Sequence, residues 1–315
     1  MDIAKTIKHM LGGPEISIFY KFHKPPYGGG NQFLSALSNE FLRRGLDIGF
    51  NKIGRNTRVC LFNSFNFDED KLLSLSKKYR PRMVNRLAGP IGIYRGTDDN
   101  LDKKLWELNR RLANHTIFQS EYSYKKYLEI GLDFGDHSII HNASDPKIFN
   151  REGKIPSPDG RRKVRLIATS WSDNPKKGGA TLSWLDENLD HTKYDLTFVG
   201  RTKSKFHLAK IIEPVASKEL SLLLKEHDIY IAPSEDDPCS NALIEALSCG
   251  LPTVYLKSGG HPELVGDGGE GFTTKEDLLQ AIDKVASNHK DYQGKIEVTP
   301  ISEVADMYLK AFKIT

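Results

Sequence analysis

Short apolar runs alternate with longer amphipathic segments along the whole chain. Runs rich in Ile, Val, Phe and Tyr are typical of buried parallel strands, and apolar side chains at every third or fourth position are typical of helices packed on a sheet. Strands are predicted at residues 16–20, 59–62, 116–120, 164–169, 196–200, 211–215 and 229–232. Helices are predicted at residues 31–44, 101–113, 217–225, 240–249 and 302–312. This alternation predicts an α/β protein with doubly wound sheets.

The clearest strand–loop–helix unit begins with the apolar run 229–232. A polar loop follows, and Ser240 is a suitable N-cap for the next helix. Gly250 stands where a helix-ending glycine belongs, and Pro252 prevents the helix from continuing. Such a unit places a ligand at the carboxyl end of the strand, against the helix N-terminus.

Two carboxylates, Asp237 and Glu245, lie within this unit. Glu245 is expected in the second helical turn, on the same face as Asn241 and between apolar neighbours. An acid near a helix N-terminus can simply complement the helix dipole, and this alternative stays open for Asp237. Because Glu245 lies further from the terminus, we expect it to accept hydrogen bonds from ligand hydroxyls.

The same stretch resembles the signature of retaining glycosyltransferases of family 4, which have the GT-B fold. That signature is an acid, seven residues, a glutamate, and then Ala-x-x-x-Gly-x-Pro. The matching residues are Asp237, Glu245, Ala246, Gly250 and Pro252. The first acid is Asp where the family usually has Glu, and residues 258–263 are similar to the next glycine-rich turn and glutamate of the family.

Three glycines at positions 28–30 lie between a predicted strand and helix. They allow a close approach of the backbone to a phosphate or sugar, although a plain tight turn explains them equally well. The spacing is not that of a dinucleotide-binding loop, which argues against a dehydrogenase. The segment resembles the N-terminal Gly-Gly loop of the family.

The resemblance also implies a grip on the donor diphosphate. Lys177 matches the family lysine, whereas Trp171 or Ser172 stands at the position of the family arginine. Arg201 is a candidate for the missing charge, with an ordinary surface arginine as the alternative. Catalytic roles are implied for Asp237, Lys177 and Glu245. The implied donor contacts are Gly29, Gly30, Lys177, Arg201, Pro214, Val215, Asp237, Cys239, Ser240, Asn241, Ala242 and Glu245.

On the acceptor side, the resemblance points to the segment around Asn85. Many relatives carry a histidine there, and this chain has none. Arg86 and Arg95 are candidates for contact with an anionic acceptor, or simply for ion pairs. Residues 68–70 spell the Asp-x-Asp string of metal-dependent GT-A transferases, but they open a predicted helix, so an acidic first turn is expected and no metal site.

The length of 315 residues suits two domains. The hydrophilic stretch 151–162, which contains Pro156, Pro158 and Gly160, is predicted to link them. We expect a first domain at 1–152 for the acceptor, a second at 153–301 for the nucleotide sugar, and a last helix at 302–315. The GT-B resemblance implies two Rossmann-like domains facing a central cleft, with the last helix packing back on the first domain.

The net charge of +4 is unevenly distributed. Residues 1–155 hold 25 Lys/Arg and 17 Asp/Glu, giving +8, and the rest hold 20 and 24, giving −4. A basic first half allows peripheral contact with an anionic membrane, although a solvated surface explains it equally well. The absence of a dense basic run or an aromatic RNA-binding motif argues against nucleic acid.

Three cysteines without paired or metal-ligand spacing indicate a reducing compartment. No secretory signal or membrane span is recognised, so we expect a cytoplasmic protein, with peripheral contact at the inner membrane face as an option.

These observations favour a metal-independent, retaining glycosyltransferase that moves a sugar from a nucleotide-diphosphate sugar to a glycan, lipid or small-molecule hydroxyl, for example in polysaccharide biosynthesis. Two alternatives stay open. One is a catalytically decayed GT-B scaffold that only binds a sugar or nucleotide, and the other is a GT-B epimerase or phosphorylase.

Overall fold

The structure is a computed structural model that describes residues 12–23, 29–96 and 100–314. The chain forms two compact α/β units. The first contains residues up to 23, residues 34–141 and residues from 301 onward, and the second contains residues 29–33 and 142–300. The chain therefore enters the second unit at residue 142, before the predicted linker, and residues 29–33 group with the second unit rather than the first.

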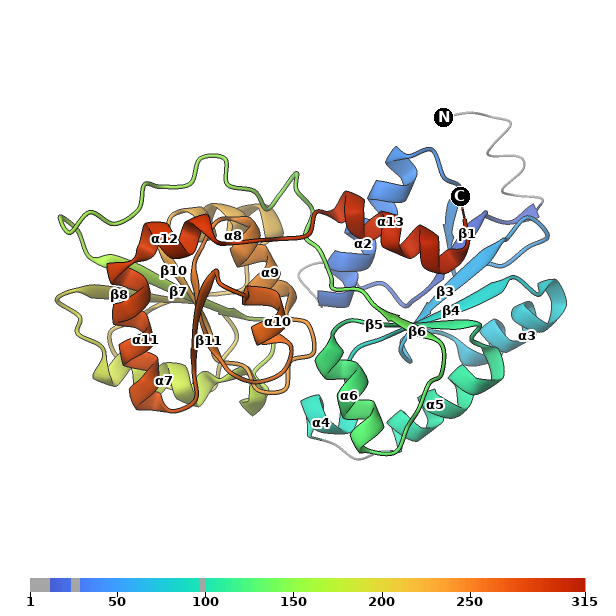
Figure 1. Cartoon of the computed structure of the whole chain (residues 1–315), viewed down its shortest axis with the longest axis horizontal. Coiled ribbons are helices and arrows are strands. Elements are labelled where there is room, and N and C mark those ends of the chain that lie inside the picture. The colour runs from blue at the N-terminus through green and yellow to red at the C-terminus, as the bar shows by residue number, and fades with distance from the viewer. Residues whose placement is uncertain (1–11, 24–28, 97–99, 315) are drawn as a thin grey trace. The chain divides into compact units, whose positions relative to one another are not determined.

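The first unit is built on a six-stranded parallel sheet with the order β2-β1-β3-β4-β5-β6. Its strands are β1 (Ile16–Phe19), β2 (Ile48–Phe50), β3 (Val59–Asn63), β4 (Arg82–Leu87), β5 (His115–Phe118) and β6 (His137–Ile139). One face of the sheet is covered by α2 (Gly29–Arg43) and α13 (Ile301–Phe312) (Figure 1). The other face carries α3 (Glu69–Tyr79), α5 (Leu101–Leu112) and α6 (Glu121–Glu129), and α4 (Ile91–Arg95) follows β4.

Helix α13 belongs to the first unit although it lies at the end of the chain. Phe312 of this helix packs against Phe41 of α2, with ring centroids 6.0 Å apart. Arg44 pairs with Asp306, and the Nε of Arg82 donates to the carbonyl of Ala311 at 3.0 Å. These apolar and polar contacts hold α13 against the first sheet.

The second unit has its own six-stranded parallel sheet, with the order β12-β11-β10-β7-β8-β9. Its strands are β7 (Val164–Ser170), β8 (Tyr194–Gly200), β9 (Lys210–Ile212), β10 (Ile229–Ala232), β11 (Thr253–Leu256) and β12 (Gly269–Phe272). Its helical segments are η1 (Pro175–Lys177), α7 (Gly179–Asn188), α8 (Ser217–Lys225), α9 (Asn241–Ser248), α10 (His261–Val265), α11 (Lys275–Ser287) and α12 (His289–Gly294).

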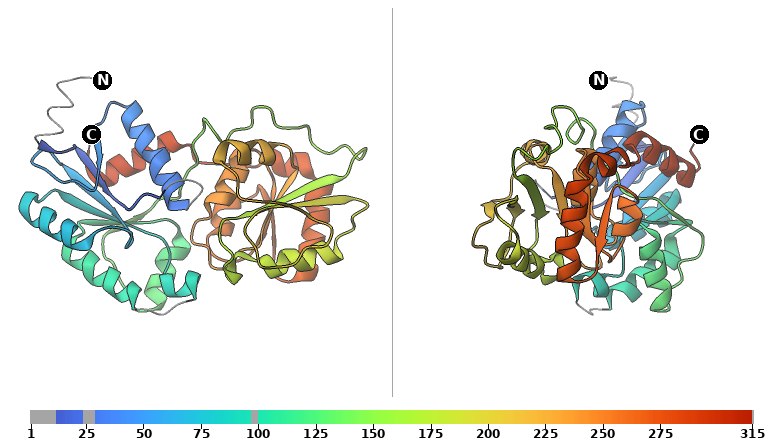
Figure 2. Two further views of the ribbon diagram at one scale, coloured as in Figure 1. Left: turned by 180° about the vertical axis from the view of Figure 1, so that it is seen from behind. Right: turned by 60° about the vertical axis from the view of Figure 1, so that its left-hand side comes forward.

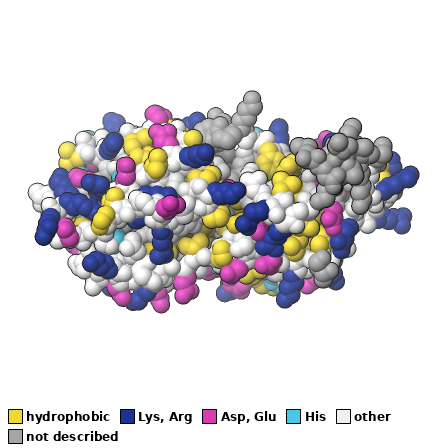
Figure 3. Space-filling view, turned by 90° about the horizontal axis from the view of Figure 1, so that it is seen from above, with side chains coloured by type: hydrophobic (Ala, Val, Ile, Leu, Met, Phe, Trp, Pro, Cys, Tyr) yellow, Lys and Arg dark blue, Asp and Glu magenta, His cyan; other side chains and the backbone are white. Residues whose placement is uncertain are grey.

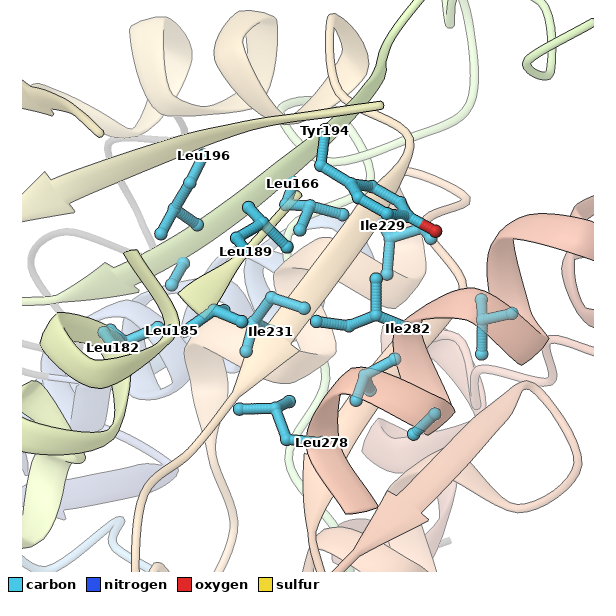
Figure 4. Close-up of a cluster of buried hydrophobic side chains, with 14 of the residues drawn as sticks. Leu166, Leu182, Leu185, Leu189, Tyr194, Leu196, Ile229, Ile231, Leu278 and Ile282 are labelled. Atoms are coloured by element: carbon cyan, nitrogen blue, oxygen red, sulfur yellow. The ribbon is translucent and has the colours of Figure 1, made fainter. Parts of the chain in front are cut away.

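Helices cover both faces of this sheet (Figure 2). On one face, α7 and α11 pack on the strands through a buried cluster that includes Leu185, Ile231 and Ile282 (Figure 4). On the other face, a second cluster joins α8 and α9 to the sheet through Leu224 and Leu247. Burial on both faces explains why the central strands are continuous apolar runs.

The predicted α/β class with two doubly wound sheets is confirmed. The ends of α9 also agree with the sequence, because Ser240 is its N-cap and Gly250 follows it with a φ of 79°. The predicted strand at 211–215 ends earlier, at Ile212. The predicted strands do not include β2, β4, β6, β11 or β12. Within the described residues, no helix is both long enough and apolar enough to cross a membrane.

Candidate functional site

The candidate site lies where the strand order of the second sheet reverses. Strands β7 and β10 are neighbours, but the chain continues from β7 toward β8 on one side and from β10 toward β11 on the other. The loops that follow these two strands therefore diverge and leave a crevice, which is where open α/β sheets bind ligands. These loops, residues 171–178 and 233–240, carry Lys177 and Asp237.

Two lysine–aspartate pairs join the loops. The Nζ of Lys177 lies 2.8 Å from Oδ2 of Asp237, and the Nζ of Lys176 lies 2.6 Å from Oδ2 of Asp236. The amide of Glu235 also donates to the carbonyl of Lys176 at 2.7 Å. The Asp237 side chain is 13% exposed and that of Lys177 is 39% exposed, so this pair faces an accessible surface and a ligand can exchange with it.

The glycine-rich turn at 258–260 contacts the backbone of Asp237 and fixes its position. Gly260 donates its amide to the carbonyl of Asp237 at 2.9 Å. Gly259 has a φ of 63°, and a Cβ on it would overlap the backbone of Asp237. Glycine is therefore required at this position for both the conformation and the close approach. The turn that resembles the family motif thus fixes the acid of the site.

The Asp237 carboxyl is ionised despite its burial. Burial acts to raise its pKa, but the positive charge of Lys177 and its hydrogen bond to Asp237 hold the pKa below its usual range. His261 itself is fully buried, and burial lowers its pKa, so the ring is neutral. Its Nδ1 lies 3.1 Å from the carbonyl of Leu256 and its Nε2 lies 3.1 Å from Oγ of Ser234. Because a carbonyl only accepts, Nδ1 carries the proton and Ser234 donates to Nε2.

Glu245 is the second carboxyl of the site. It lies in the second turn of α9, is only 7% exposed, and its carboxyl has no hydrogen-bond partner within the part of the chain that the structure describes. Burial raises its pKa to about 8. A buried carboxyl without a protein partner is available to accept from, or donate to, a ligand that enters the crevice.

The hydroxyl of Tyr230 lies close enough to the Asp237 and Glu245 carboxyls for both to affect its pKa. This hydroxyl lies 3.0 Å from Oγ1 of Thr169, which is near the carboxyl end of β7. Burial raises the pKa of Tyr230, and the negative charges of Glu245 and Asp237 raise it further. Lys177, Asp237, Tyr230 and Glu245 therefore occupy one region of the second unit. Sequence reasoning missed Tyr230, Ser234 and His261, because single polar residues inside apolar or turn segments give no distinctive signal.

Several other predicted donor contacts surround α9. Asn241 accepts at Oδ1 from Nδ2 of Asn142 at 3.2 Å, and a Cβ on Gly29 would overlap its amide. The Cys239 sulfur accepts from the amide of Asn142 at 3.4 Å, and Ser240 caps the helix next to Ala242. Gly30 lies in the first turn of α2, whereas Gly28 lies outside the described residues.

The remaining donor-side candidates lie at sheet and loop edges. Arg201 directly follows β8, its side chain is exposed, and its amide donates to the carbonyl of Ser170 at 2.9 Å. Pro214 and Val215 belong to the connection between β9 and α8 rather than to a strand. The contacts of these three residues with a donor stay predictions.

Two of the three acceptor-side candidates are buried inside the first unit. Asn85 is fully buried and donates to the carbonyl of Phe62 at 3.0 Å. Arg86 is 1% exposed and donates to the side chains of Asn63 and Tyr308. Their burial contradicts direct contact with an acceptor, because strand β4 directs both side chains into packed layers. Arg95 is exposed at the end of α4, near the Phe65 ring, and stays a candidate.

The Asp-x-Asp string has the structural role that was expected. Asp68 is the N-cap of α3 and accepts the amide of Lys71 at 3.0 Å, and Glu69 and Asp70 form the acidic first turn. Within the described ranges, no group of three or more His, Cys, Asp or Glu side chains is arranged to hold a metal ion.

Comparison with known proteins assigns this architecture. A sequence model of the family "Glycosyl transferases group 1" matches residues 182–288, a segment that contains Asp237 and Glu245. The solved sucrose-phosphate synthase of Thermosynechococcus elongatus is 12% identical, covers 95% of this chain and 98% of its own, and has a TM-score of 0.71. Anabaena HepE, solved with UDP and glucose, is 15% identical, covers 95% and 99%, and has a TM-score of 0.69.

The fold is GT-B. The predicted resemblance is confirmed for the fold over nearly the whole chain and for the family model over residues 182–288. The Arabidopsis thaliana sulfoquinovosyl transferase SQD2 is 24% identical over 201 residues, which are 58% of this chain and 39% of that protein. A probable sucrose-phosphate synthase of Thermosipho melanesiensis is 23% identical over 192 residues, 55% and 45% of the two chains. The matches thus span less than half of these GT-B relatives.

Proposed function

We propose that this GT-B protein is a retaining glycosyltransferase that transfers a sugar from a nucleotide-diphosphate sugar to an acceptor hydroxyl without a metal ion. The observation that carries the proposal is the set of Lys177, Asp237 and Glu245 at the switch point of the second sheet. Lys177 is accessible, and the Glu245 carboxyl has no hydrogen-bond partner among the described residues. HepE, which has a similar fold, is described in complex with UDP and with UDP-glucose, which supports a nucleotide-sugar donor.

Breaking the bond between the sugar and the diphosphate leaves negative charge on the departing phosphate. Lys177 and the free amides at the start of α9 are suited to stabilise this charge, and together they take the part that a divalent cation plays in other transferases. In this proposal the diphosphate competes with Asp237 for the ammonium group of Lys177. The displaced Asp237 carboxylate is then available to the sugar hydroxyls, and Glu245 binds the ribose hydroxyls.

The acceptor is proposed to be a glycan, a lipid or a small molecule with a free hydroxyl. Arg95 is the acceptor-side candidate that the structure leaves accessible. On the molecular face in Figure 3, Lys and Arg side chains are dispersed among acidic and apolar ones. This distribution does not select a membrane acceptor.

The first test is the thermal stability of the protein with UDP, GDP, ADP and their sugars. A ligand at about 100 times its dissociation constant adds roughly 2.7 kcal/mol to the free energy of unfolding. We expect one nucleotide to stabilise the wild type and to lose this effect in Lys177→Ala and in Glu245→Ala. Lys193→Ala is the matched control, because Lys193 is also paired with an aspartate but precedes β8, at the opposite end of the strands.

The second test is turnover with the donor that binds. Transfer that continues in excess EDTA and gives a product with the donor's anomeric configuration, read by NMR, supports the metal-independent retaining reaction. Binding without any transfer or hydrolysis favours the decayed scaffold, and no shift with any nucleotide at millimolar concentration contradicts the proposal.

A further inference from the structure

The first unit contains a cavity of about 730 Å³ at the amino-terminal edge of its sheet. It is formed by the C-terminal ends of α3 and α5, which lie side by side on one sheet face, and by the beginning of β4 (Figures 1 and 2). In open α/β sheets, ligands of the main site lie at the other, carboxyl edge. The cavity is therefore separate from the switch-point crevice of this sheet.

The charged side chains that line this cavity are all cationic. They are Lys77, Arg80, Arg82 and Arg111, and none of the described residues that line it is acidic. None of these four cations has an ion-pair partner in the described parts of the chain, whereas Arg44 and Arg58 of the same unit are paired with carboxylates. Like charges that share one cavity repel each other, so an anion that enters it is attracted by all four.

Helix dipoles explain only part of this arrangement. Lys77 lies in the last turn of α3 and Arg111 in the last turn of α5, where cations favourably face the helix C-terminal carbonyls. Arg80 and Arg82 lie outside both helices. Arg80 is the residue after α3 and has a φ of 52°, a conformation in which glycine or asparagine is the usual choice. As the C-cap of α3, Arg80 also lies at the helix C-terminal carbonyls, so Arg82 is the cation of the four that neither helix dipole explains.

The groups that face these cations from neighbouring elements offset only part of their charge. The Nε of Arg82 donates to the carbonyl of Ala311 at 3.0 Å, which is a neutral acceptor. The nearby Asp136 is already paired with His115 at 2.9 Å, and this hydrogen bond, with a smaller contribution from Arg82, lowers the pKa of Asp136. Among the described residues, no carboxylate forms an ion pair with Lys77, Arg80, Arg82 or Arg111, so most of the positive charge of the cavity is available to an anion from outside.

We propose that this basic cavity binds the phosphate group of a phosphate ester, with the uncharged part of the ligand lying on its apolar floor. The floor is provided by Leu73 and Met83, and the cavity is larger than a single phosphate requires. The same chemistry occurs in a soluble phosphate ester and in the headgroup of an anionic lipid. The site is independent of the proposed donor site, which belongs to the second unit.

Two probes distinguish these sources. Glycerol 3-phosphate, titrated by calorimetry, represents the soluble ester, and vesicles of phosphatidylglycerol and phosphatidylcholine, compared with phosphatidylcholine alone, represent the lipid. The full-length wild type is compared with Lys77→Gln/Arg111→Gln. The matched control is Lys103→Gln/Lys104→Gln, which removes two exposed charges from the first turn of α5 but does not alter the cavity. Lys177→Ala is included to exclude a contribution from the second unit.

The cavity variant is expected to lose about 30-fold in affinity for one of the two probes at low salt, because each cation near an anionic surface contributes a factor of about five. A selective loss with vesicles identifies a lipid headgroup, and a selective loss with glycerol 3-phosphate identifies a soluble ester. The proposal is overturned if neither probe binds, if the control variant loses as much as the cavity variant, or if the binding disappears in Lys177→Ala. Unchanged melting temperatures show that the variants are folded.

Discussion

Both units are built on a six-stranded parallel sheet, with different strand orders, and they differ in what their polar strand-end residues do. In the second unit, Lys177 and Asp237 lie in loops beyond β7 and β10, are partly exposed, and form an ion pair with each other. In the first unit, Asn85 and Arg86 lie within β4 itself and are buried. The carboxyl edge of the sheet thus carries an accessible candidate site in the second unit, whereas these polar residues of the first unit are packed interior.

The partner of Arg86 explains the difference. Tyr308 of α13 accepts from the Nε of Arg86 at 3.0 Å, so the terminal helix covers this part of the first sheet. In the second unit, by contrast, the carboxyl of Glu245 finds no such partner among the described residues. The polar side chains within β4 form hydrogen bonds inside the unit, whereas Lys177 and Asp237 beyond the strand ends stay accessible to a ligand. The following predictions test this distinction.

The largest expected effect is on catalysis. Asp237→Asn is expected to lower kcat/KM for the donor at least about 100-fold, because the site loses the charge that orients Lys177 and the sugar. Steady-state kinetics measure this. Asp236→Asn is the matched control, since Asp236 forms the neighbouring pair with Lys176. Equal losses in both variants would show that the Lys176–Asp236 pair is as important for transfer as Lys177–Asp237, and would contradict the special role of Asp237.

The next largest effect is on the stability of the first unit. Arg86→Met is expected to lower the free energy of unfolding by about 3 kcal/mol, because Asn63 and Tyr308 are left buried without their donor. Chemical denaturation measures this change. Tyr308→Phe removes one hydrogen bond and is expected to cost about 1 kcal/mol. A loss of acceptor affinity in Arg86→Met with no change in stability would restore the original acceptor-side role.

A third prediction concerns the pH dependence of stability through Glu245. A carboxyl whose pKa is raised on folding stabilises the folded state at pH values below its ordinary pKa of 4.5, and this contribution is lost as the pH rises toward about 8. The wild type is therefore expected to lose about 4 kcal/mol relative to Glu245→Gln between pH 5 and pH 9. Denaturation curves at both pH values measure the difference. Parallel pH profiles would mean that Glu245 is ionised and satisfied.

The smallest expected effect concerns the Asp-x-Asp string. Asp68→Ala is expected to destabilise the protein by about 1 kcal/mol, because α3 loses its N-cap, and to leave transfer activity unchanged. Thermal unfolding and donor turnover measure the two quantities. A large loss of activity at unchanged stability would assign Asp68 a ligand-binding role and place a functional carboxylate in the first unit.

Cap residues and apolar periodicity were enough to predict the elements whose ends are set by neighbouring residues. Helix α9 was predicted with its ends, because Ser240 and Gly250 mark them directly. Strand β12, with the sequence Gly-Glu-Gly-Phe, was missed because it has little apolar content and depends on pairing with β11. The early entry into the second unit at residue 142 was missed because a composition change at 151–162 marks a loop but not a contact boundary.

The candidate site was only partly predictable for the same reason. Lys177 and Asp237 are 60 residues apart, and the family resemblance, rather than any local pattern, indicated that they meet. The burial of Arg86 depends on Tyr308, which lies 222 residues further along the chain, so no local pattern could reveal it. His261 was overlooked because its role depends on contacts with Ser234 and Leu256 that the sequence does not indicate.

The most direct test of the central claim is hydrogen–deuterium exchange, read by mass spectrometry, with and without saturating UDP. The account predicts slower exchange in peptides covering residues 171–178 and 233–245, and no change in peptides covering the buried strands β3 and β4 of the first unit. Lys177→Ala is expected to abolish the protection. Protection confined to the first unit, or protection of 171–178 and 233–245 that persists in Lys177→Ala, would contradict the assignment of the donor site.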